Sequence, residues 1–505
     1  MSSSVAPFKK QQYSDLKRDC VKNKKLFEDP EFPANDSSVF YKEKRFGIVK
    51  WKRPGEITSD PRLFVEGINS HDLNQGHVGN CWFVAASSCL ALKPKLWKKV
   101  IPDWEEQDWD PKHPENYAGI FHFRFWVFGQ WTDVVVDDRL PTVDGRLIYC
   151  HSNSKREFWS ALLEKAYAKL YGCYESLRGG KAGDAVVDFS GAVCETIDLE
   201  EEAFYKDQEK QNHLFEKLLE IYNCGGIISC SIKVSTEHKS EHKMSNGLVK
   251  GHAYAVTAVK RVHLGHGPYP RTKAFPMIRM RNPWGYKEWN GPWSDSSEEW
   301  SKISNAERHK LELTVEDDGE FWMSFEDWCR HFSMAQVNHI VDPSLTNSRT
   351  WNEALHFGSW TRHVDPVLNR SGGCKSMTVL QNPQYVFDVT KKTDEVMITL
   401  QQKDQRTHKK TGHGENVAIG FEVYEVESNR KYRINQLRNQ KQMGNQHFSY
   451  YRSVFMRCNL PKGRYVVIPS TLQAGIQGEF MLRIFTHEDS SCRYENDYHG
   501  VKLGL

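Results

Sequence analysis

The pattern of apolar and polar positions divides the 505-residue chain into regions with different expected structures. "CWFVAASSCLAL", at residues 81–92, is apolar at almost every position, which is typical of a helix buried on all sides. "EFWSALLEKAYAKLYG" predicts a second helix over 157–170, ended by Gly172. "YAGIFHFRFWVFGQWTDVVVDD" alternates with period two instead, which predicts a β-hairpin that turns at Gly129.

The second half of the chain reads differently. "GGIISCSI", "GHAYAVTAVKRV" and "MIRMRNPWG" predict strands, and "SFEDWCRHF" predicts a helix after them. Beyond about residue 344 the pattern consists of short strands separated by turn residues, which favours a β-sandwich. The expected fold class is therefore α+β, followed by an all-β region.

Two further segments stand out before any chemistry is considered. Residues 9–25 carry seven basic side chains at roughly helical spacing, which predicts a short basic helix that ends at the prolines of "EDPEFP". A solvated arm is the alternative for this segment. "LRGGKAGD", with Gly179, Gly180 and Gly183, is the best candidate for a hinge.

Composition excludes several classes of protein. A net charge of +3 is too small to indicate a nucleic-acid partner by itself. The chain has no apolar run of about 18 residues, and its N-terminus does not resemble a secretory signal. The twelve cysteines include no C-x-x-C pair, which argues against a zinc ribbon and a disulfide framework. We therefore expect reduced thiols and a cytoplasmic protein.

Cys81 is the first candidate catalytic residue, because it follows Asn80 at the predicted start of a helix. A helix N-terminus favours a thiolate, and Asn80 is suited to cap it. The backbone N–H of Cys81 and the side-chain amide of Gln75 could stabilise an oxyanion formed during attack on a carbonyl. A buried structural cysteine remains the alternative for a lone thiol.

A thiol nucleophile also needs a base, and the base needs an orienting group. His252 follows a glycine at the mouth of a strand, in "GHAYAVTAV", and Asn282 ends the next strand, in "RNPWG". The Asn282 carbonyl oxygen can accept the imidazole N–H and hold one tautomer. A satisfied core histidine and a loop-capping asparagine are the alternatives.

"QGHVGNCW", "KGHAYAV" and "RNPWG", in this order and spacing, resemble the catalytic segments of the calpains, which are intracellular calcium-activated cysteine proteases. "YAGIFHFRFW", "VVDDRLPT", "EWNGPWSD" and "DDGEFWMSF" resemble the same family, and the likeness runs from about residue 20 to residue 487. Asn80, where conventional members carry aspartate, points to an atypical branch.

The resemblance implies a papain-like protease core split into two lobes, followed by a C2-like sandwich. Cys81 is then the nucleophile, His252 the base, Asn282 its orienter and Gln75 an oxyanion donor. Trp284 matches a tryptophan that obstructs the cleft in the inactive arrangement. The expected domains are an N-terminal arm at 1–25, a first lobe at 26–180, a second lobe at 181–343, the sandwich at 344–487 and a short tail at 488–505.

Calcium binding is also implied, although the sequence contains no EF-hand loop. Calcium takes six to eight oxygen ligands, and two clusters offer them, with solvated acidic turns as the alternative. The expected ligands are the carbonyls of Val65 and Gly67 with the carboxylates of Asp72 and Glu157 in the first lobe, and Glu288, Asp295, Asp318, Glu320 and the carbonyl of Glu316 in the second.

Three features depart from conventional calpains. Ser70 replaces an arginine that is expected to couple the lobes, through Glu320 in this numbering. The sandwich carries "KDQRTHKKTGHGEN" where an acidic loop is usual, so attraction to an anionic membrane or an acidic partner is an alternative to a solvated loop. The tail contains neither a further C2 domain nor EF-hands for docking a small subunit.

The expected function is that of a calcium-activated cysteine endopeptidase that makes limited cuts in protein substrates. A catalytically silent scaffold and a membrane-recruited adaptor are the alternatives. The expected location is the cytoplasm, with membrane-associated or nuclear positions as alternatives, and no nucleic-acid partner is expected.

Overall fold

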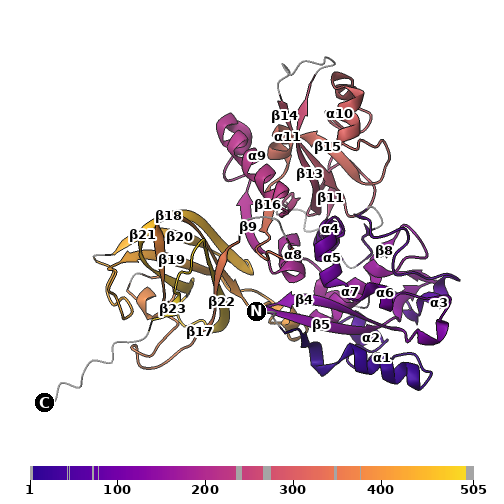
Figure 1. The fold of residues 1–505 in the computed structure, drawn as a ribbon, viewed down its shortest axis with the longest axis horizontal. Coiled ribbons are helices and arrows are strands. Elements are labelled where there is room, and N and C mark those ends of the chain that lie inside the picture. The colour runs from indigo at the N-terminus through magenta and orange to yellow at the C-terminus, as the bar shows by residue number, and fades with distance from the viewer. Residues whose placement is uncertain are drawn as a thin grey trace. The chain divides into compact units, whose positions relative to one another are not determined.

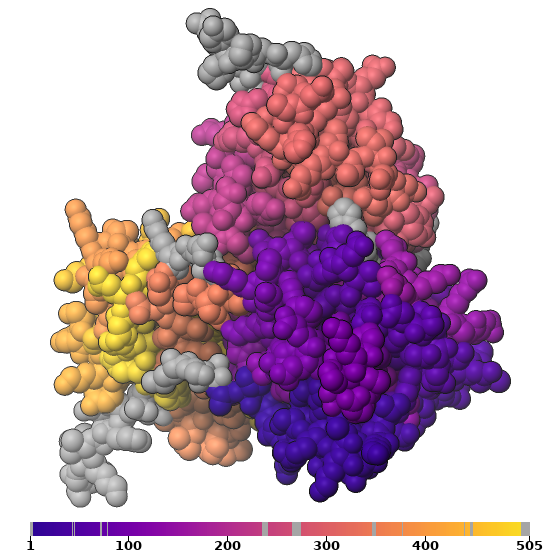
Figure 2. Space-filling view, turned by 45° about the vertical axis from the view of Figure 1, so that its right-hand side comes forward, coloured from indigo at the N-terminus to yellow at the C-terminus, as the bar shows by residue number. Residues whose placement is uncertain are grey.

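The computed structural model describes residues 4–42, 44, 46–70, 73–77, 79–234, 241–264, 274–345, 350–375, 377–438 and 440–495. Its backbone contacts separate two compact units, residues 1–192 with 196–347 and residues 193–195 with 348–505. None of the helices within these ranges has both the length and the apolar character that a membrane crossing requires. The first unit contains two lobes with separate hydrophobic cores, coloured indigo to violet and magenta to orange (Figure 2).

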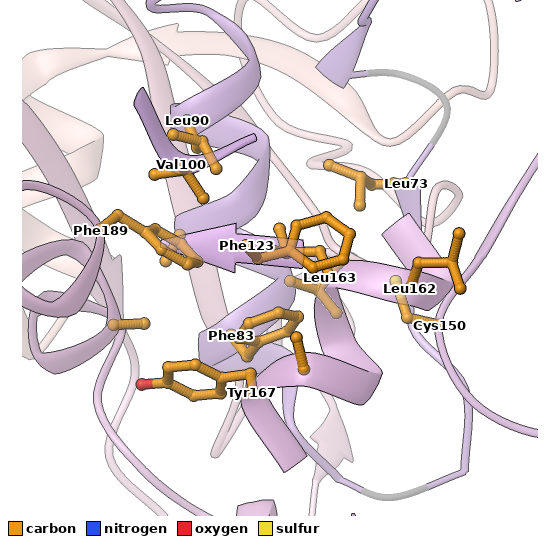
Figure 3. Packing of buried hydrophobic residues seen from close by; sticks show 14 of the residues in the cluster. Leu73, Phe83, Leu90, Val100, Phe123, Cys150, Leu162, Leu163, Tyr167 and Phe189 are labelled. Carbon is orange, nitrogen blue, oxygen red and sulfur yellow. The ribbon is translucent and has the colours of Figure 1, made fainter. Parts of the chain in front are cut away.

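The first lobe packs helices against a hairpin. Helix α4 (Cys81–Ala91) is buried along its whole length, which agrees with its apolar sequence. Figure 3 shows Phe83 of this helix packed near Phe123 of β4 (Ile120–Val127) and Tyr167 of α7 (Trp159–Tyr171), with Leu90 farther along the helix beside Val100. The resulting aromatic core holds the N-terminus of α4 in a fixed position.

Both secondary-structure predictions for this region are confirmed. The hairpin of β4 and β5 (Gln130–Asp137) turns at Phe128 and Gly129, and Gly172 follows α7 with a φ of 104°. The remaining elements of the first lobe are β1 (Ala6–Pro7), η1 (Phe8–Lys10), α1 (Tyr13–Lys22), α2 (Asp36–Val39), β2 (Lys50–Lys52), α3 (Pro54–Ile57), β3 (Leu73–Asn74), α5 (Pro94–Val100), α6 (Trp104–Gln107), η3 (Pro114–Asn116), β6 (Leu140–Val143), β7 (Arg146–Leu147), β8 (His151–Ser152) and η4 (Tyr174–Leu177).

The segment after the candidate hinge belongs to the core of the first lobe. Helix α8 (Ala182–Ser190) contributes Ala185, Val186 and Phe189 to the same cluster as α4. The core of the second lobe begins farther along, at Leu199. The basic N-terminal segment is also shorter as a helix than expected, since α1 ends at Lys22 and a 3-10 turn precedes it.

The second lobe is built on a six-stranded sheet in the order β15-β14-β13-β10-β16-β9 (Figure 1). The sheet strands are β9 (Val193–Asp198), β10 (Ile227–Ser231), β13 (Ala253–His263), β14 (Ala274–Arg281), β15 (Glu320–Ser324) and β16 (Met334–His339). The other elements are η5 (Phe204–Lys206), α9 (Gln208–Asn223), β11 (His242–Lys243), β12 (Val249–Lys250), η6 (Glu298–Lys302), α10 (Asn305–Lys310) and α11 (Phe325–His331). The antiparallel strands β13 and β14 place the start of one beside the end of the other.

The second unit is an all-β sandwich, as predicted. Two long strands, β18 (Tyr385–Gln402) and β21 (Ser453–Thr471), pair along their length except for a register shift between Val389 and Thr393. One half of this ribbon continues through β22 (Gly478–Thr486) to β17 (Asn352–Trp360), and the other through β19 (Ile419–Val426) to β20 (Lys441–Ser449). Strand β23 (Arg493–Tyr494) pairs with β18. Two 3-10 turns, η7 (Val379–Gln381) and η8 (Gln405–Thr411), complete the unit.

Some basic side chains of the loop at 403–416 interact with acidic residues of the sandwich itself. Lys403 forms an ion pair with Glu479 at 2.8 Å, and Arg406 is buried beside Asp404. Asp404 also lies 3.2 Å from Arg452. Two of the four predicted basic side chains, Lys403 and Arg406, therefore have acidic neighbours within the sandwich.

Candidate active site

The candidate nucleophile, Cys81, is the first residue of α4 and is largely buried. Asn80 occupies the N-cap position of α4, as predicted, but its side chain makes no capping hydrogen bond to the helix. Its amide nitrogen donates instead to Glu164 of α7 at 2.6 Å, and the second oxygen of Glu164 accepts from the backbone of Cys150 at 2.8 Å. A buried carboxylate needs such donors, and this need outweighs capping.

Glu164 was missed at the level of the sequence. Burial raises the pKa of its carboxyl to about 7, and the hydrogen bonds from Asn80 and Cys150 act in the opposite direction. The only signal was a glutamate within the mainly apolar "WSALLEKAYA". Through Asn80, this residue anchors the turn that presents Cys81.

His252 and Asn282 meet because of strand order. His252 immediately precedes β13 and Asn282 immediately follows β14, and the register pairs Ala255 with Arg281. The imidazole Nε2 lies 2.7 Å from Asn282 Oδ1, and both residues are fully buried. Since a carbonyl oxygen only accepts, Nε2 carries the proton and Nδ1 faces the rest of the site.

Trp284 covers this pair. Its ring centroid is 4.8 Å from that of His252, and its backbone N–H donates to Asn282 Oδ1 at 3.0 Å. The indole therefore helps to keep water from the bond between His252 and Asn282, which strengthens that bond. The predicted role of Trp284 in obstructing the cleft stays a prediction.

The two lobes bring Cys81 and His252 together. Cys81 Sγ, a ring nitrogen of His252 and a carboxylate oxygen of Glu241 all lie within 4.8 Å of one another. Glu241 Oε1 is 3.2 Å from His252 Nδ1. Burial lowers the pKa of His252, but contacts with Cys81 and Glu241 outweigh burial and raise it to about 9. The imidazolium is therefore the favoured form near neutral pH.

Gln75 lies at the junction of the lobes, beside the same cluster. Its backbone N–H donates to the Pro283 carbonyl at 3.0 Å, and nearby Arg281 donates to the Leu73 carbonyl at 3.1 Å. Hydrogen bonds to His252, Cys81 and the Gln75 side chain lower the pKa of Glu241 against the effect of burial. Glu241 was not predicted, because nothing in the polar stretch "STEHKSEHK" distinguishes it.

The structure brings the carboxylates of the second acidic cluster close to one another, while their role as calcium ligands stays a prediction. Glu288 accepts from Gly319 N at 2.9 Å, Asp295 from Glu316 N at 3.2 Å, and Asp318 from Glu320 N at 2.8 Å. Burial and neighbouring carboxylates raise the pKa of Glu288 to about 8 and that of Asp295 to about 6. This crowded, oxygen-only set fits a hard divalent cation.

Glu320 differs from the other members of this cluster. Its carboxylate lies 3.5 Å from Arg279 Nε, on the neighbouring strand of the same sheet. Glu320 therefore already faces a guanidinium in its own lobe, before any residue at position 70 is considered. Ser70 is itself buried, and its hydroxyl finds no hydrogen-bond partner among the described residues.

The first acidic cluster is only partly described, because Asp72 lies outside the described residues. Glu157 is buried, and its two oxygens accept from Val65 N and Ser152 Oγ, each at 2.7 Å. Gly67 has a φ of 94°, which suits a tight turn of the same loop. The structure thus places the Val65 amide beside Glu157, and the calcium role of the Val65 carbonyl stays a prediction.

A thiol at a helix start, within reach of an asparagine-oriented histidine, defines the class of papain-like cysteine peptidases. A family model described as calpain family cysteine protease matches residues 27–339, and a model of domain III of the calpain large subunit matches residues 356–485. The chain belongs to the calpain family.

Named relatives agree with this assignment. The chain is 56% identical to calpain-5 of Mus musculus over 498 residues. This alignment covers 98% of this chain and 78% of that protein. It is 40% identical to calpain-5 of Caenorhabditis elegans, over all of this chain and 80% of that protein. The calpain-1 catalytic subunit of Gallus gallus is 38% identical, over 97% of this chain and 69% of that protein. The sequence also resembles calpain-5, an atypical member of the family, and this resemblance is confirmed.

Proposed function

We propose that this calpain-family cysteine protease is a calcium-activated endopeptidase that makes limited cuts in proteins with a Cys81–His252–Asn282 triad. The observation that carries the proposal is the position of Cys81 Sγ beside a ring of His252 whose far nitrogen is bonded to Asn282. Each group belongs to the elements expected of its role, a helix start for the nucleophile and two strand ends for the base and its orienter.

In the proposed reaction, the Cys81 proton passes to His252 Nδ1, and the thiolate attacks the carbonyl carbon of a substrate peptide. The imidazolium is stabilised because its Nε2–H donates to Asn282 Oδ1. His252 then gives its proton to the leaving amine, and an acyl-enzyme remains on sulfur. Water attacks the acyl carbon, His252 accepts its proton, and the thiol is restored when the carboxylic product leaves.

Charge that develops on the substrate oxygen needs donors. The backbone N–H of Cys81, at the N-terminus of α4, and the side-chain amide of Gln75 are suited to supply them. Removal of one such donor typically lowers kcat by about 10²–10³-fold. Glu241 now contacts Gln75, Cys81 and His252, so the substrate carbonyl and this carboxylate compete for the same groups.

The second acidic cluster is bonded to the triad through one glycine. Asn282 N donates to the Gly319 carbonyl at 2.8 Å, while Gly319 N donates to Glu288 at 2.9 Å. Asn282 Nδ2 also donates to the Lys287 carbonyl, and Lys287 N to Asp317, each at 3.0 Å. Bound calcium would neutralise these carboxylates, and the loops they fix hold Asn282 against His252.

A peptidase assay on the full chain tests the proposal, with and without calcium. The wild type is expected to cleave a casein-like substrate only with calcium, and Cys81→Ser should remove cleavage without changing the circular dichroism spectrum. Loss of the nucleophile should lower kcat on the order of 10⁶-fold. Cleavage by Cys81→Ser, or equal wild-type rates after chelation, would contradict the proposal.

The proposal places the protein in the cytoplasm, because a reducing compartment keeps the Cys81 thiol competent for attack. Attraction to an anionic membrane receives less support, since Lys403 and Arg406 of the basic loop have acidic neighbours. Vesicle pelleting at low and high salt would measure any remaining attraction.

A further inference from the structure

Glu241 gives the catalytic centre a third potential metal ligand that papain-like chemistry does not require. The cluster consists of Cys81 Sγ, His252 and the Glu241 carboxylate, all within 4.8 Å of one another. His252 is fully buried, Cys81 is largely buried, and the Glu241 side chain is 26% exposed. A thiolate, an imidazole and a carboxylate this close together can bind one metal ion, which a simple ion pair cannot do.

The geometry at His252 suits such a set. Its Nε2–H is committed to Asn282 Oδ1 at 2.7 Å, so Nδ1 is the nitrogen that faces Glu241, at 3.2 Å. In a tetrahedral zinc site, bonds of about 2.0 Å to nitrogen and oxygen separate those two ligand atoms by about 3.3 Å. A hydrogen bond from the far ring nitrogen to a carbonyl oxygen is also what usually orients a zinc-bound histidine.

From this arrangement we propose that Cys81, His252 Nδ1 and Glu241 form an inhibitory site for Zn²⁺, with water as the fourth ligand. The mixed sulfur, nitrogen and oxygen set selects a borderline-soft ion over calcium, which takes six to eight oxygens. Binding displaces to solvent the Nδ1 proton of the His252 imidazolium and any proton on the Cys81 sulfur, and it leaves a zinc thiolate. The metal then occupies the sulfur lone pair and His252 Nδ1, both of which the reaction needs.

The inhibitory part of this inference rests on the proposed peptidase function, but the binding part does not. The first experiment therefore uses the full chain without substrate, in saturating calcium so that oxygen-rich sites are filled. Co²⁺ replaces Zn²⁺ as the probe, because a thiolate ligand gives Co²⁺ a strong near-ultraviolet charge-transfer band. Zn²⁺ affinity follows from its displacement of Co²⁺.

The wild type is expected to show the charge-transfer band at one equivalent of Co²⁺, and Cys81→Ser should lose it. Glu241→Gln keeps the size of the side chain but removes the charged ligand, so affinity for Zn²⁺ should fall by at least about tenfold. Glu241→Asp should recover part of the loss. Glu298→Gln, an exposed glutamate of the same lobe, is the matched control and should bind as the wild type does. Thermal unfolding checks that each variant is folded.

A second experiment measures peptide cleavage against free Zn²⁺. Inhibition should be reversed by a chelator that spares calcium, and Glu241→Gln should move the half-inhibitory concentration upward by the same factor of at least about tenfold. The absence of the charge-transfer band, or equal Zn²⁺ affinity of wild type and Glu241→Gln, would overturn the inference. A protein that shows the band but never cleaves peptide would contradict the proposed function and leave the metal site standing.

Discussion

In the first lobe Glu157 and Glu164 are buried and face hydrogen-bond donors, whereas in the second lobe Glu288, Asp295 and Asp318 are crowded and only partly buried. Each carboxylate of the first group accepts two hydrogen bonds from fixed partners. In the second group, burial raises the pKa values of Glu288 and Asp295, and the neighbouring Asp318 raises both further. The nucleophile's lobe is therefore held together by its own contacts, whereas the base's lobe keeps crowded carboxylates that a cation can neutralise.

The largest expected effect is at Glu164. Glu164→Ala leaves the Asn80 amide and the Cys150 N–H without an acceptor, and each buried orphan costs about 1–3 kcal/mol. The free energy of unfolding should therefore fall by about 2–6 kcal/mol in denaturant titrations. The exposed Glu202→Ala should change it by less than about 0.5 kcal/mol. A loss at Glu164 as small as this would show that the first lobe does not depend on the contact.

The pH dependence of stability gives the next largest effect. The pKa of Glu164 is raised from 4.5 to about 7, so the folded state holds its proton over a range in which the unfolded state has lost it. This group therefore lowers stability progressively as pH rises from 4.5 through 7, by about 3 kcal/mol in total. Glu164→Gln removes this ionisable group. The difference in the free energy of unfolding between wild type and Glu164→Gln should therefore change with pH by this amount. If the free energies of unfolding of the two proteins change in parallel between pH 5 and 8, the raised pKa of Glu164 is refuted.

A glutamine in place of Glu157 tests the first lobe with a smaller change. One amide oxygen cannot replace both carboxylate oxygens, so either Val65 N or Ser152 Oγ loses its acceptor. Glu157→Gln should lower the free energy of unfolding by about 1–3 kcal/mol in calcium-free buffer. An increase in stability would mean that this carboxylate, like those of the second lobe, is unfavourable without a cation.

The same substitution in the second lobe should act with the opposite sign. Glu288→Gln can still accept from Gly319 N, and it removes a carboxyl that burial and its acidic neighbours keep from ionising near neutral pH. Without calcium, stability should rise by up to about 1 kcal/mol, and the gain on adding calcium should shrink. Glu298→Gln is the control, because it removes an exposed charge outside the cluster. If Glu288→Gln destabilises the calcium-free protein, the contrast between the lobes fails.

Local sequence patterns were sufficient to predict several elements of the fold. The uniform apolar character of 81–92 and the alternation around Gly129 were sufficient for α4 and the hairpin, because each pattern reflects burial of nearby residues. The candidate triad could also be predicted, because short motifs indicate which residues lie at the ends of helices and strands. The contacts that could not be predicted join distant positions, such as Asn80 to Glu164, 84 residues apart. Capping rules describe neighbours along the chain, and they could not foresee a competing acceptor from another helix.

Glu241 illustrates a second limit. It lies only eleven residues before His252, but its contact with the imidazole depends on tertiary structure that the sequence pattern does not show. The prediction for the basic loop had a similar weakness, because the pairing of Lys403 with Glu479 spans 76 residues. In both places composition described the side chains correctly and said nothing about their partners.

The backbone conformation of Gly319 restricts which residues the protein can carry at this position. Its φ is 85°, and a Cβ there would lie 2.9 Å from the Asn282 carbonyl oxygen and 3.0 Å from the Tyr286 amide. The residue has no side chain and takes no part in the chemical reaction, but its backbone carbonyl accepts from Asn282 N and its N–H donates to Glu288. Any inherited substitution at this codon would disturb both the orienter and the acidic loop. A missense change at Gly319 should therefore be interpreted as damaging, although no catalytic residue is altered.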